Sequence, residues 1–475
     1  MAKKKYDEYI EDEEMYEESD EQYEEEEQEE YVDEKSARRV ARRKRRIRNQ
    51  IIAYAVLVVL IGVVVGGGIF GVSKLFGNKN ASSGNDTASA ENADGSSYDG
   101  GLIQIDAPEI ALHYSEDQAA QNTPMEDLTV NPVDEYALAQ IAQMSIQEKV
   151  AGLFFATPES MMDGVDQAVV AGAKTQQALE TYAVGGIIYT TKNIQSLDKI
   201  TEMISKTKTM SKYPLFIGAQ EEGGNMSMIS AALSDAPKLS SASEIGATGE
   251  SSNAYDSYAK TAQYMASIGF NVDFAPNGMI GNSKRAFAAD AETVSTFLYQ
   301  ATTGLEDNKV SAAVIGFPGE GSAEGNVADG RATVNLDLDT LESSDVVPYK
   351  MAVNSKADMI MVSNVSYPSI VGDYTPATMS TAIVTDLLRN QLGYDGVVIT
   401  QPMNVKAVTD YYTSAQASVN AILAGCDMIL MPENFKEAYQ GVLDAVNAGE
   451  ISESRLDESL LRIYRIKMQD SVSQN

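Results

Sequence analysis

Histidine and cysteine are almost absent from this chain, whose 475 residues include only His113 and Cys426. A single cysteine cannot form an intrachain disulfide, and Cys426 opens an apolar run, so we predict a small buried core residue. His113 lies in an acidic, irregular stretch, which leaves the part expected to fold without an imidazole. Histidine-based zinc sites, Ser-His-Asp triads and histidine general acids are therefore excluded there, and we expect no metal or cofactor.

Positive charge is also scarce, with 36 Lys and Arg against 69 Asp and Glu, a net charge of −33. Residues 6–34 hold eighteen acidic side chains and no basic ones, whereas residues 35–48 hold nine basic side chains. The first fifty residues therefore contribute −6 (12 basic, 18 acidic) and the remainder contributes −27 (24 basic, 51 acidic). A surface this acidic repels polyanions, so we expect no nucleic-acid partner.

Residues 51–73 carry no charge at all. Twenty-three residues at about 1.5 Å each span the hydrocarbon core of roughly 30 Å. Nine basic residues precede the run and only Lys74 and Lys79 follow closely, which predicts a cytoplasmic N-terminus and an extracellular remainder. A cleaved signal peptide fits poorly, because the run starts fifty residues in and lacks a small-residue cleavage site. The sequence therefore predicts a single-pass protein of the cell membrane, with the lipid bilayer around residues 51–73.

The segments on either side of this run have too few apolar residues to fold alone. Residues 1–50 form a cytoplasmic tail, first acidic and then basic, which is either simply solvated or a docking site for a basic cytoplasmic partner. Residues 74–133, rich in Ser, Gly, Asn and Asp, read as an extracellular stalk. We predict the folded domain over residues 134–470.

Eight short apolar runs recur in this domain, each followed by a loop and a helical pattern. Continuous apolar runs are typical of parallel strands covered on both faces. Ser145 and Glu148 form a capping box that predicts a helix start before the first run. Eight repeats favour an α/β fold of the (β/α)₈ TIM-barrel type over a doubly wound sheet, with the active site at the carboxyl ends of the strands. The runs are 152–156, 185–189, 214–218, 271–275, 312–317, 358–362, 396–400 and 427–431.

The segments after these strands carry recognisable motifs. Residues 220–226 read QEEGGNM where one family has D-Q-E-G-G-R-V, and residues 315–321 read IGFPGEG for its K-H-F-P-G-H-G. Residues 400–403 read TQPM for S-D-D-L, and residues 424–432 read AGCDMILMP for A-G-A-D-L-L-L-M-P. Over roughly residues 137–470 the chain resembles glycoside hydrolase family 3, specifically its single-barrel β-N-acetylhexosaminidase branch. The resemblance implies a barrel that binds or cleaves aminosugar glycans, such as those of cell walls.

The same resemblance implies that the catalytic groups are lost. Gln401 stands at the nucleophile position, Asn326 and Ala328 at the acid–base Asp and His, and Ile315 and Gly316 at a Lys-His pair. A neutral amide cannot form the glycosyl-enzyme ester as a carboxylate does. Neither asparagine nor alanine can donate and recover a proton near pH 7. We therefore predict an inactive site with no assigned catalytic residue.

Five residues are candidate ligand contacts by the same comparison. Gln220 and Asn225 replace a sugar-binding Asp and an Arg, whereas Glu222 and the Arg285 of an R-A-F segment are retained. Gln401 completes the set.

Glu222 and Glu320 follow two strands on the same rim and are fallback carboxylates. A retaining glycosidase needs its carboxyl groups about 5–5.5 Å apart, and an inverting one about 6.5–9.5 Å. The structural alternatives are that Glu222 bonds to its own loop backbone, that Glu320 is a solvated loop residue, and that Arg285 forms a structural ion pair, for instance with Asp290.

Three functions stay open at this stage. The first is a membrane-anchored barrel that binds cell-wall glycan or a protein partner without hydrolysis. The second is an active β-N-acetylhexosaminidase-type glycosidase that uses Glu222 and Glu320. The third is a membrane scaffold that acts through its acidic cytoplasmic tail.

Overall fold

The computed structural model describes residues 131–472. The predicted tail of residues 1–50, the membrane helix of residues 51–73 and most of the stalk lie outside the described residues. Among the helices of residues 131–472, none combines the length and apolar character needed to cross a membrane.

Eight parallel strands form a barrel, in the order β7-β6-β5-β4-β3-β2-β1-β8. The open edge of this order is joined by a parallel bridge between Ile399 and Met428 and by the N–H of Met403, which donates to the carbonyl of Leu430 at 2.9 Å. Each predicted run contains a strand, so the predicted TIM-type barrel is confirmed. The strands are β1 (Phe154–Ala156), β2 (Gly186–Ile188), β3 (Phe216–Ala219), β4 (Val272–Asp273), β5 (Ser311–Phe317), β6 (Met359–Val362), β7 (Val397–Thr400) and β8 (Ile429–Leu430).

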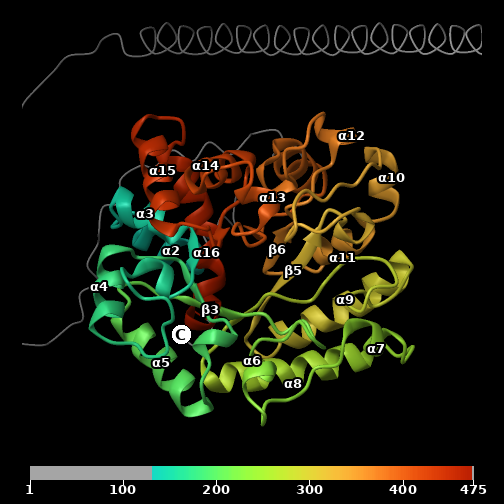
Figure 1. The fold of residues 1–475 in the computed structure, drawn as a ribbon, viewed down its shortest axis with the longest axis horizontal. Coiled ribbons are helices and arrows are strands. Elements are labelled where there is room, and N and C mark those ends of the chain that lie inside the picture. The colour runs from blue at the N-terminus through green and yellow to red at the C-terminus, as the bar shows by residue number, and fades with distance from the viewer. Residues whose placement is uncertain (1–130, 473–475) are drawn as a thin grey trace, which may run out of the picture. The chain divides into compact units, whose positions relative to one another are not determined.

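Helices surround the strands, as Figure 1 shows for α4, α5, α8, α9 and α11 around β3, β5 and β6. The long helices are α2 (Pro132–Ile141), α3 (Ile146–Gly152), α4 (Ala173–Thr181), α5 (Leu197–Met210), α8 (Ser252–Ile268), α9 (Ala291–Glu306), α11 (Val347–Asn354), the π-helix η6 (Ala382–Gln391), α14 (Ser414–Ala424), α15 (Phe435–Asn447) and α16 (Glu453–Val472). Short helices in the connections are α6 (Ile229–Ala232), α7 (Ala242–Gly246), α10 (Leu338–Ser343), α12 (Pro368–Val371) and α13 (Lys406–Thr409).

Two local predictions from the sequence are confirmed: the capping box at the start of the barrel and the burial of its cysteine. The N–H of Ser145 donates to Glu148 at 2.9 Å and the N–H of Glu148 donates back to Ser145 Oγ at 3.3 Å, which is the predicted capping box. Cys426 is fully buried, as predicted.

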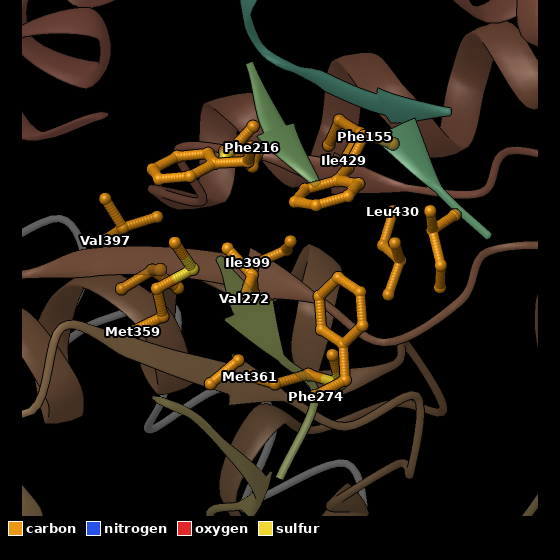
Figure 2. Packing of buried hydrophobic residues seen from close by; sticks show 14 of the residues in the cluster. Phe155, Phe216, Val272, Phe274, Met359, Met361, Val397, Ile399, Ile429 and Leu430 are labelled. Carbon is orange, nitrogen blue, oxygen red and sulfur yellow. The ribbon is translucent and has the colours of Figure 1, made fainter. Parts of the chain in front are cut away.

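Aromatic and aliphatic side chains from many strands fill the barrel interior (Figure 2). The Phe155 ring lies 6.3 Å from that of Phe216 and 5.0 Å from that of Phe274. Gly186 and Gly218 make room for it, because a Cβ there would lie 2.7 Å and 2.9 Å from the Phe155 ring. The interior is therefore a packed core, and a ligand can enter only at an end of the barrel.

Asp427, directly before β8, joins the last strands to the last helix. Its side chain is fully buried and pairs with Arg389, Arg455 and Arg462. It also accepts the N–H of Val398 at 2.9 Å. Burial alone would raise the pKa of this carboxyl, but the three guanidinium groups outweigh burial and lower the pKa. The charge is thus retained at the point where the barrel closes.

The first and last helices lie together. Arg465 of α16 pairs with Asp134 of α2 at 2.7 Å. A pocket of about 530 Å³ is lined by Asn131 together with Asp358 and Gly396, which directly precede β6 and β7. The chain therefore enters the barrel beside the amino ends of the strands.

Candidate functional site

A buried ion pair stands at the carboxyl ends of β3 and β4. Glu222 follows β3, and Arg285 lies in the loop after β4. The guanidinium is bidentate, with Nε donating to Oε1 at 2.6 Å and Nη2 donating to Oε2 at 2.9 Å. The Glu222 side chain is 1% exposed and that of Arg285 is 28% exposed. Burial would lower the pKa of Arg285, but pairing with Glu222 raises it overall, so the cation is retained.

Other groups take up the remaining hydrogen-bonding capacity of Glu222. Gln220 Nε2 donates to Oε2 at 3.2 Å, and Asn277 Nδ2 donates to Oε1 at 3.4 Å. The hydroxyl of Tyr258, from α8, donates to the Glu222 carbonyl at 3.2 Å. A carboxylate held by this many donors is a weak nucleophile, because each bond stabilises its charge in place.

Gln401, at the end of β7, is fixed at both ends of its amide. The backbone N–H of Asn364 donates to Oε1 at 2.8 Å, and Nε2 donates to Glu320 Oε2 at 2.7 Å. Because a backbone N–H can only donate, the amide oxygen must face Asn364 and the amide nitrogen must face Glu320. Asn364 is itself held by Thr378, whose hydroxyl donates to Oδ1 at 2.8 Å. The surroundings therefore fit an amide at this position.

Glu320 lies between Gln401 and Arg285. Its Oε1 is 3.7 Å from Arg285 Nη1, and its side chain is 13% exposed. Burial and the neighbouring Glu222 raise the pKa of Glu320 above its usual value, although Arg285 and Gln401 act in the opposite direction. Arg285 thus serves two carboxylates, of which Glu320 is the more distant.

Gly316, which the resemblance aligns with a histidine of the family, has little space for a side chain. Its φ is +98°, and a Cβ there would lie 2.7 Å from the hydroxyl of Tyr349. That hydroxyl donates to the carbonyl of Ile315 at 3.0 Å. A side chain at residue 316 would displace Tyr349, so the region no longer has room for an imidazole.

Two of these side chains, those of Arg285 and Glu320, line a pocket of about 310 Å³ at the barrel mouth. Arg285 and Glu320 contribute its charge, and Ala323, Asn326, Val327 and Ala332 of the loop after β5 form another part of its lining. Ligand sites usually enclose about 300–1,000 Å³, so the pocket suits a small group such as one sugar ring.

The structure brings together five of the predicted site residues: Gln220, Glu222, Arg285, Glu320 and Gln401. Asn326 is exposed and lines the pocket. Asn225 and Ala328 are exposed and are not part of the pocket lining.

Two structural alternatives raised by the sequence are wrong, and the third holds with another partner. Glu222 bonds to Arg285 rather than to the backbone of its own loop. Arg285 forms a structural ion pair, but with Glu222 and not with Asp290, whose side chain caps α9 by accepting the N–H of Thr293 at 2.8 Å. Glu320 is not a solvated loop residue, because it bonds to Gln401.

Sequence reasoning missed Asn277, Asn364 and the two helix tyrosines, Tyr258 and Tyr349. The two asparagines follow β4 and β6 closely, which is a signal for a site residue in a barrel. The tyrosines lie on α8 and α11, and no local pattern distinguishes them from ordinary core residues.

Within residues 131–472, no group of three or more His, Cys, Asp or Glu side chains is arranged to hold a metal ion. The groups that line the pocket are the Arg285 guanidinium, the Glu320 carboxylate and the amides of Asn282 and Asn326.

Replacing Gln401 by glutamate tests how closely this position is adapted to an amide. We expect Gln401→Glu to lower the free energy of unfolding by about 1–3 kcal/mol near pH 7.5. The substitution replaces the hydrogen bond between Gln401 and Glu320 with two carboxylates that face each other. Like charges raise the pKa of one acid above its unfolded value, so the folded state binds more protons. The deficit should therefore shrink as the pH falls toward 5, measured by urea unfolding at several pH values.

The control is the exchanged pair Glu320→Gln/Gln401→Glu, which restores one amide facing one carboxylate. It should recover most of the lost stability. If Gln401→Glu unfolds like the original chain at every pH, the adaptation to an amide is refuted.

Comparison with protein families settles the ancestry of this barrel. The model of the glycosyl hydrolase family 3 N-terminal domain matches residues 140–466. The chain belongs to glycoside hydrolase family 3. Among its relatives, a β-hexosaminidase of Stenotrophomonas maltophilia is 30% identical over 284 residues, which is 57% of this chain and 83% of that protein.

Other family 3 members extend the comparison. β-Hexosaminidase A of Pseudoalteromonas piscicida is 26% identical over 326 residues, which is 61% of this chain and 54% of the relative, so the match spans about half of that protein. The structure of a family 3 β-N-acetylglucosaminidase from a Paenibacillus strain superposes with a TM-score of 0.64 at 28% identity, covering 70% of this chain and 63% of that one. The chain is thus a β-hexosaminidase-like member of family 3.

Proposed function

We propose that this family 3 barrel binds an N-acetylglucosamine-containing glycan without hydrolysing it. The observation that carries the proposal is Gln401: it occupies the nucleophile position and bonds through both ends of its amide, to Asn364 and to Glu320. A site that had merely lost one acid would keep surroundings suited to a carboxylate. Here the neighbours complement the amide.

The second candidate, a glycosidase using Glu222 and Glu320, needs both carboxylates free to act. Both oxygens of Glu222 are bonded to Arg285. Glu320, with its raised pKa, suits a proton donor, but a donor without a nucleophile or base completes no cleavage. The binding role therefore accounts better for the same residues.

The ligand class rests on the family, since the relatives are named β-hexosaminidases and a β-N-acetylglucosaminidase. We further propose that residues 51–73 anchor the chain in a membrane with the barrel outside, facing cell-wall glycan. The alternative of a scaffold acting through residues 1–50 requires no ligand at the pocket.

Calorimetry of the full chain with an N-acetylglucosamine tetramer tests this proposal. We expect saturable binding, with the tetramer recovered intact by chromatography. The pocket-filling variant Ala323→Tyr should weaken binding at least about tenfold, because a phenol ring would occupy space that lines the site. Ala448→Tyr, at an exposed alanine outside the pocket, is the matched control.

Two results would contradict the proposal. If Ala323→Tyr and Ala448→Tyr bound the tetramer with equal affinity, the pocket would not be the binding site. Recovery of shorter sugars in molar excess over the protein would show that the protein hydrolyses the glycan.

A further inference from the structure

Three loops meet beside the pocket and hold one another through backbone bonds. Residues 324–333 form a hairpin in which the N–H of Glu324 donates to the carbonyl of Thr333 at 2.8 Å and the N–H of Thr333 donates back at 2.9 Å. Thr333 bridges to Ser366, and Ser366 bridges to Pro376. The connected segments are therefore positioned by a small sheet of their own rather than left as free loops.

The third loop is attached to the same hairpin. The N–H of Ala407, in α13, donates to the carbonyl of Val327 at 3.0 Å. Each of the three segments presents one large exposed side chain: Arg331 from the hairpin, Tyr374 beside Pro376, and Tyr411 directly after α13.

These three side chains form a cluster that we call the tyrosine–arginine clamp (Arg331, Tyr374, Tyr411). The Arg331 guanidinium carbon lies 3.8 Å from the ring centroid of Tyr411 and 5.3 Å from that of Tyr374. Tyr411 remains 46% exposed and Tyr374 remains 52% exposed. A guanidinium over an aromatic face is stabilised by the ring's quadrupole, which restricts its orientation.

The Arg331 guanidinium stacks through its flat face, which leaves the N–H groups at its edge available to donate hydrogen bonds. Within residues 131–472, the Arg331 side chain donates no hydrogen bond and forms no ion pair with a carboxylate. The side chain of Asp373, which precedes Tyr374, is occupied in accepting the N–H of Thr375 at 2.8 Å. A planar cation with unpaired N–H groups is suited to bidentate binding of a carboxylate.

The clamp adjoins the pocket already described. Ala332, next to Arg331, lines that pocket, as do Asn326 and Val327 of the same hairpin. Val365 also lines the pocket, and it lies next to Ser366, which bridges to the loop that carries Tyr374. A chain of sugars bound in the pocket would therefore extend across the hairpin toward the clamp.

The net charge of the protein further restricts the class of ligand. Residues 51–475 carry a net charge of −27, which repels polyanions at long range. One exposed guanidinium suits a ligand with an isolated carboxylate on an otherwise uncharged body. Exposed tyrosine rings favour the apolar face of a sugar, since they offer flat area at low conformational cost.

We propose that the tyrosine–arginine clamp binds the carboxylate of an acidic saccharide unit, attached to the aminosugar held in the pocket. This inference rests on the proposed glycan-binding function and names the kind of glycan that the site selects.

The test is calorimetry of the full chain with a tetrasaccharide of alternating N-acetylglucosamine and glucuronic acid, and with the methyl ester of the same tetrasaccharide. The ester removes the charge while keeping the sugar rings. We expect the acid to bind about tenfold more tightly than the ester, a preference that weakens as salt is raised. Arg331→Gln should abolish the preference while leaving the affinity for the uncharged N-acetylglucosamine tetramer unchanged.

Arg331→Lys should retain only part of the preference, because an ammonium group lacks the planar pair of donors. Equal binding of acid and ester, or a preference that survives in Arg331→Gln, would overturn the clamp while leaving the pocket's function intact. Failure of all three sugars to bind would instead remove the proposed function, and the clamp inference with it.

Discussion

With a chromogenic aryl β-N-acetylglucosaminide, kcat of the full chain is expected to be about 10⁴–10⁶-fold below that of an active relative. Removing one catalytic group costs several orders of magnitude in rate, and groups that act as a unit lose little more when removed together. The resemblance to the family aligns Gln401 with the nucleophile, and Asn326 and Ala328 with the acid–base pair. The β-hexosaminidase of Stenotrophomonas maltophilia, assayed alongside, supplies the reference rate.

The variants Glu222→Gln and Glu320→Gln serve as controls for this expectation. Any residual release of the chromophore should be the same in both as in the original chain. Turnover within about a hundredfold of the reference that disappears in either variant would establish a mechanism with relocated carboxylates. The structure argues against that outcome, because Glu222 is held by Arg285 through both of its oxygens.

Arg285→Ala is expected to lower the free energy of unfolding by about 3–5 kcal/mol. The substitution leaves the Glu222 carboxylate, 1% exposed, without its cation, and a buried charge that loses its partner is strongly destabilising. It also removes the only cation that pairs with Glu320 within residues 131–472. Because the chain has no tryptophan, unfolding in urea is best followed by circular dichroism.

Two further variants separate loss of the ion pair from simple loss of a side chain. Lys284→Ala changes an exposed neighbour and should alter stability by less than about 0.5 kcal/mol. Arg285→Met/Glu222→Gln removes both charges and should be more stable than Arg285→Ala. A double variant as unstable as the single one would mean that packing, not charge, accounts for the loss.

The sequence predicts the barrel well because its signals are local and repeated. Each buried strand is a continuous apolar run, and the predicted boundaries differ from those of the structure by two residues or fewer at every end. At the first run the prediction included Gly152, which instead ends α3. Apolar character alone cannot distinguish the last turn of a buried helix from the start of a buried strand.

Five of the residues singled out in the sequence lie together in the structure, but their pairings were not predicted. Glu222 and Arg285 are 63 residues apart, and Glu320 and Gln401 are 81 apart, so only closure of the barrel brings each pair together. The sequence instead suggested Asp290 as the partner of Arg285, being the acid nearest along the chain. Asp290 lies directly before a helix, where its carboxylate satisfies a free N–H, and that local role takes precedence.

Placement of Asn131 beside the amino ends of β6 and β7 has a practical consequence for experiments on this protein. Arg285 and Glu320 border the pocket at the carboxyl ends of the strands, which is the other end of the barrel. A sensor chip or bead coupled at Asn131 itself would therefore be attached to the end of the barrel opposite the pocket. Coupling at this residue would leave the pocket open to solutes in the surrounding buffer.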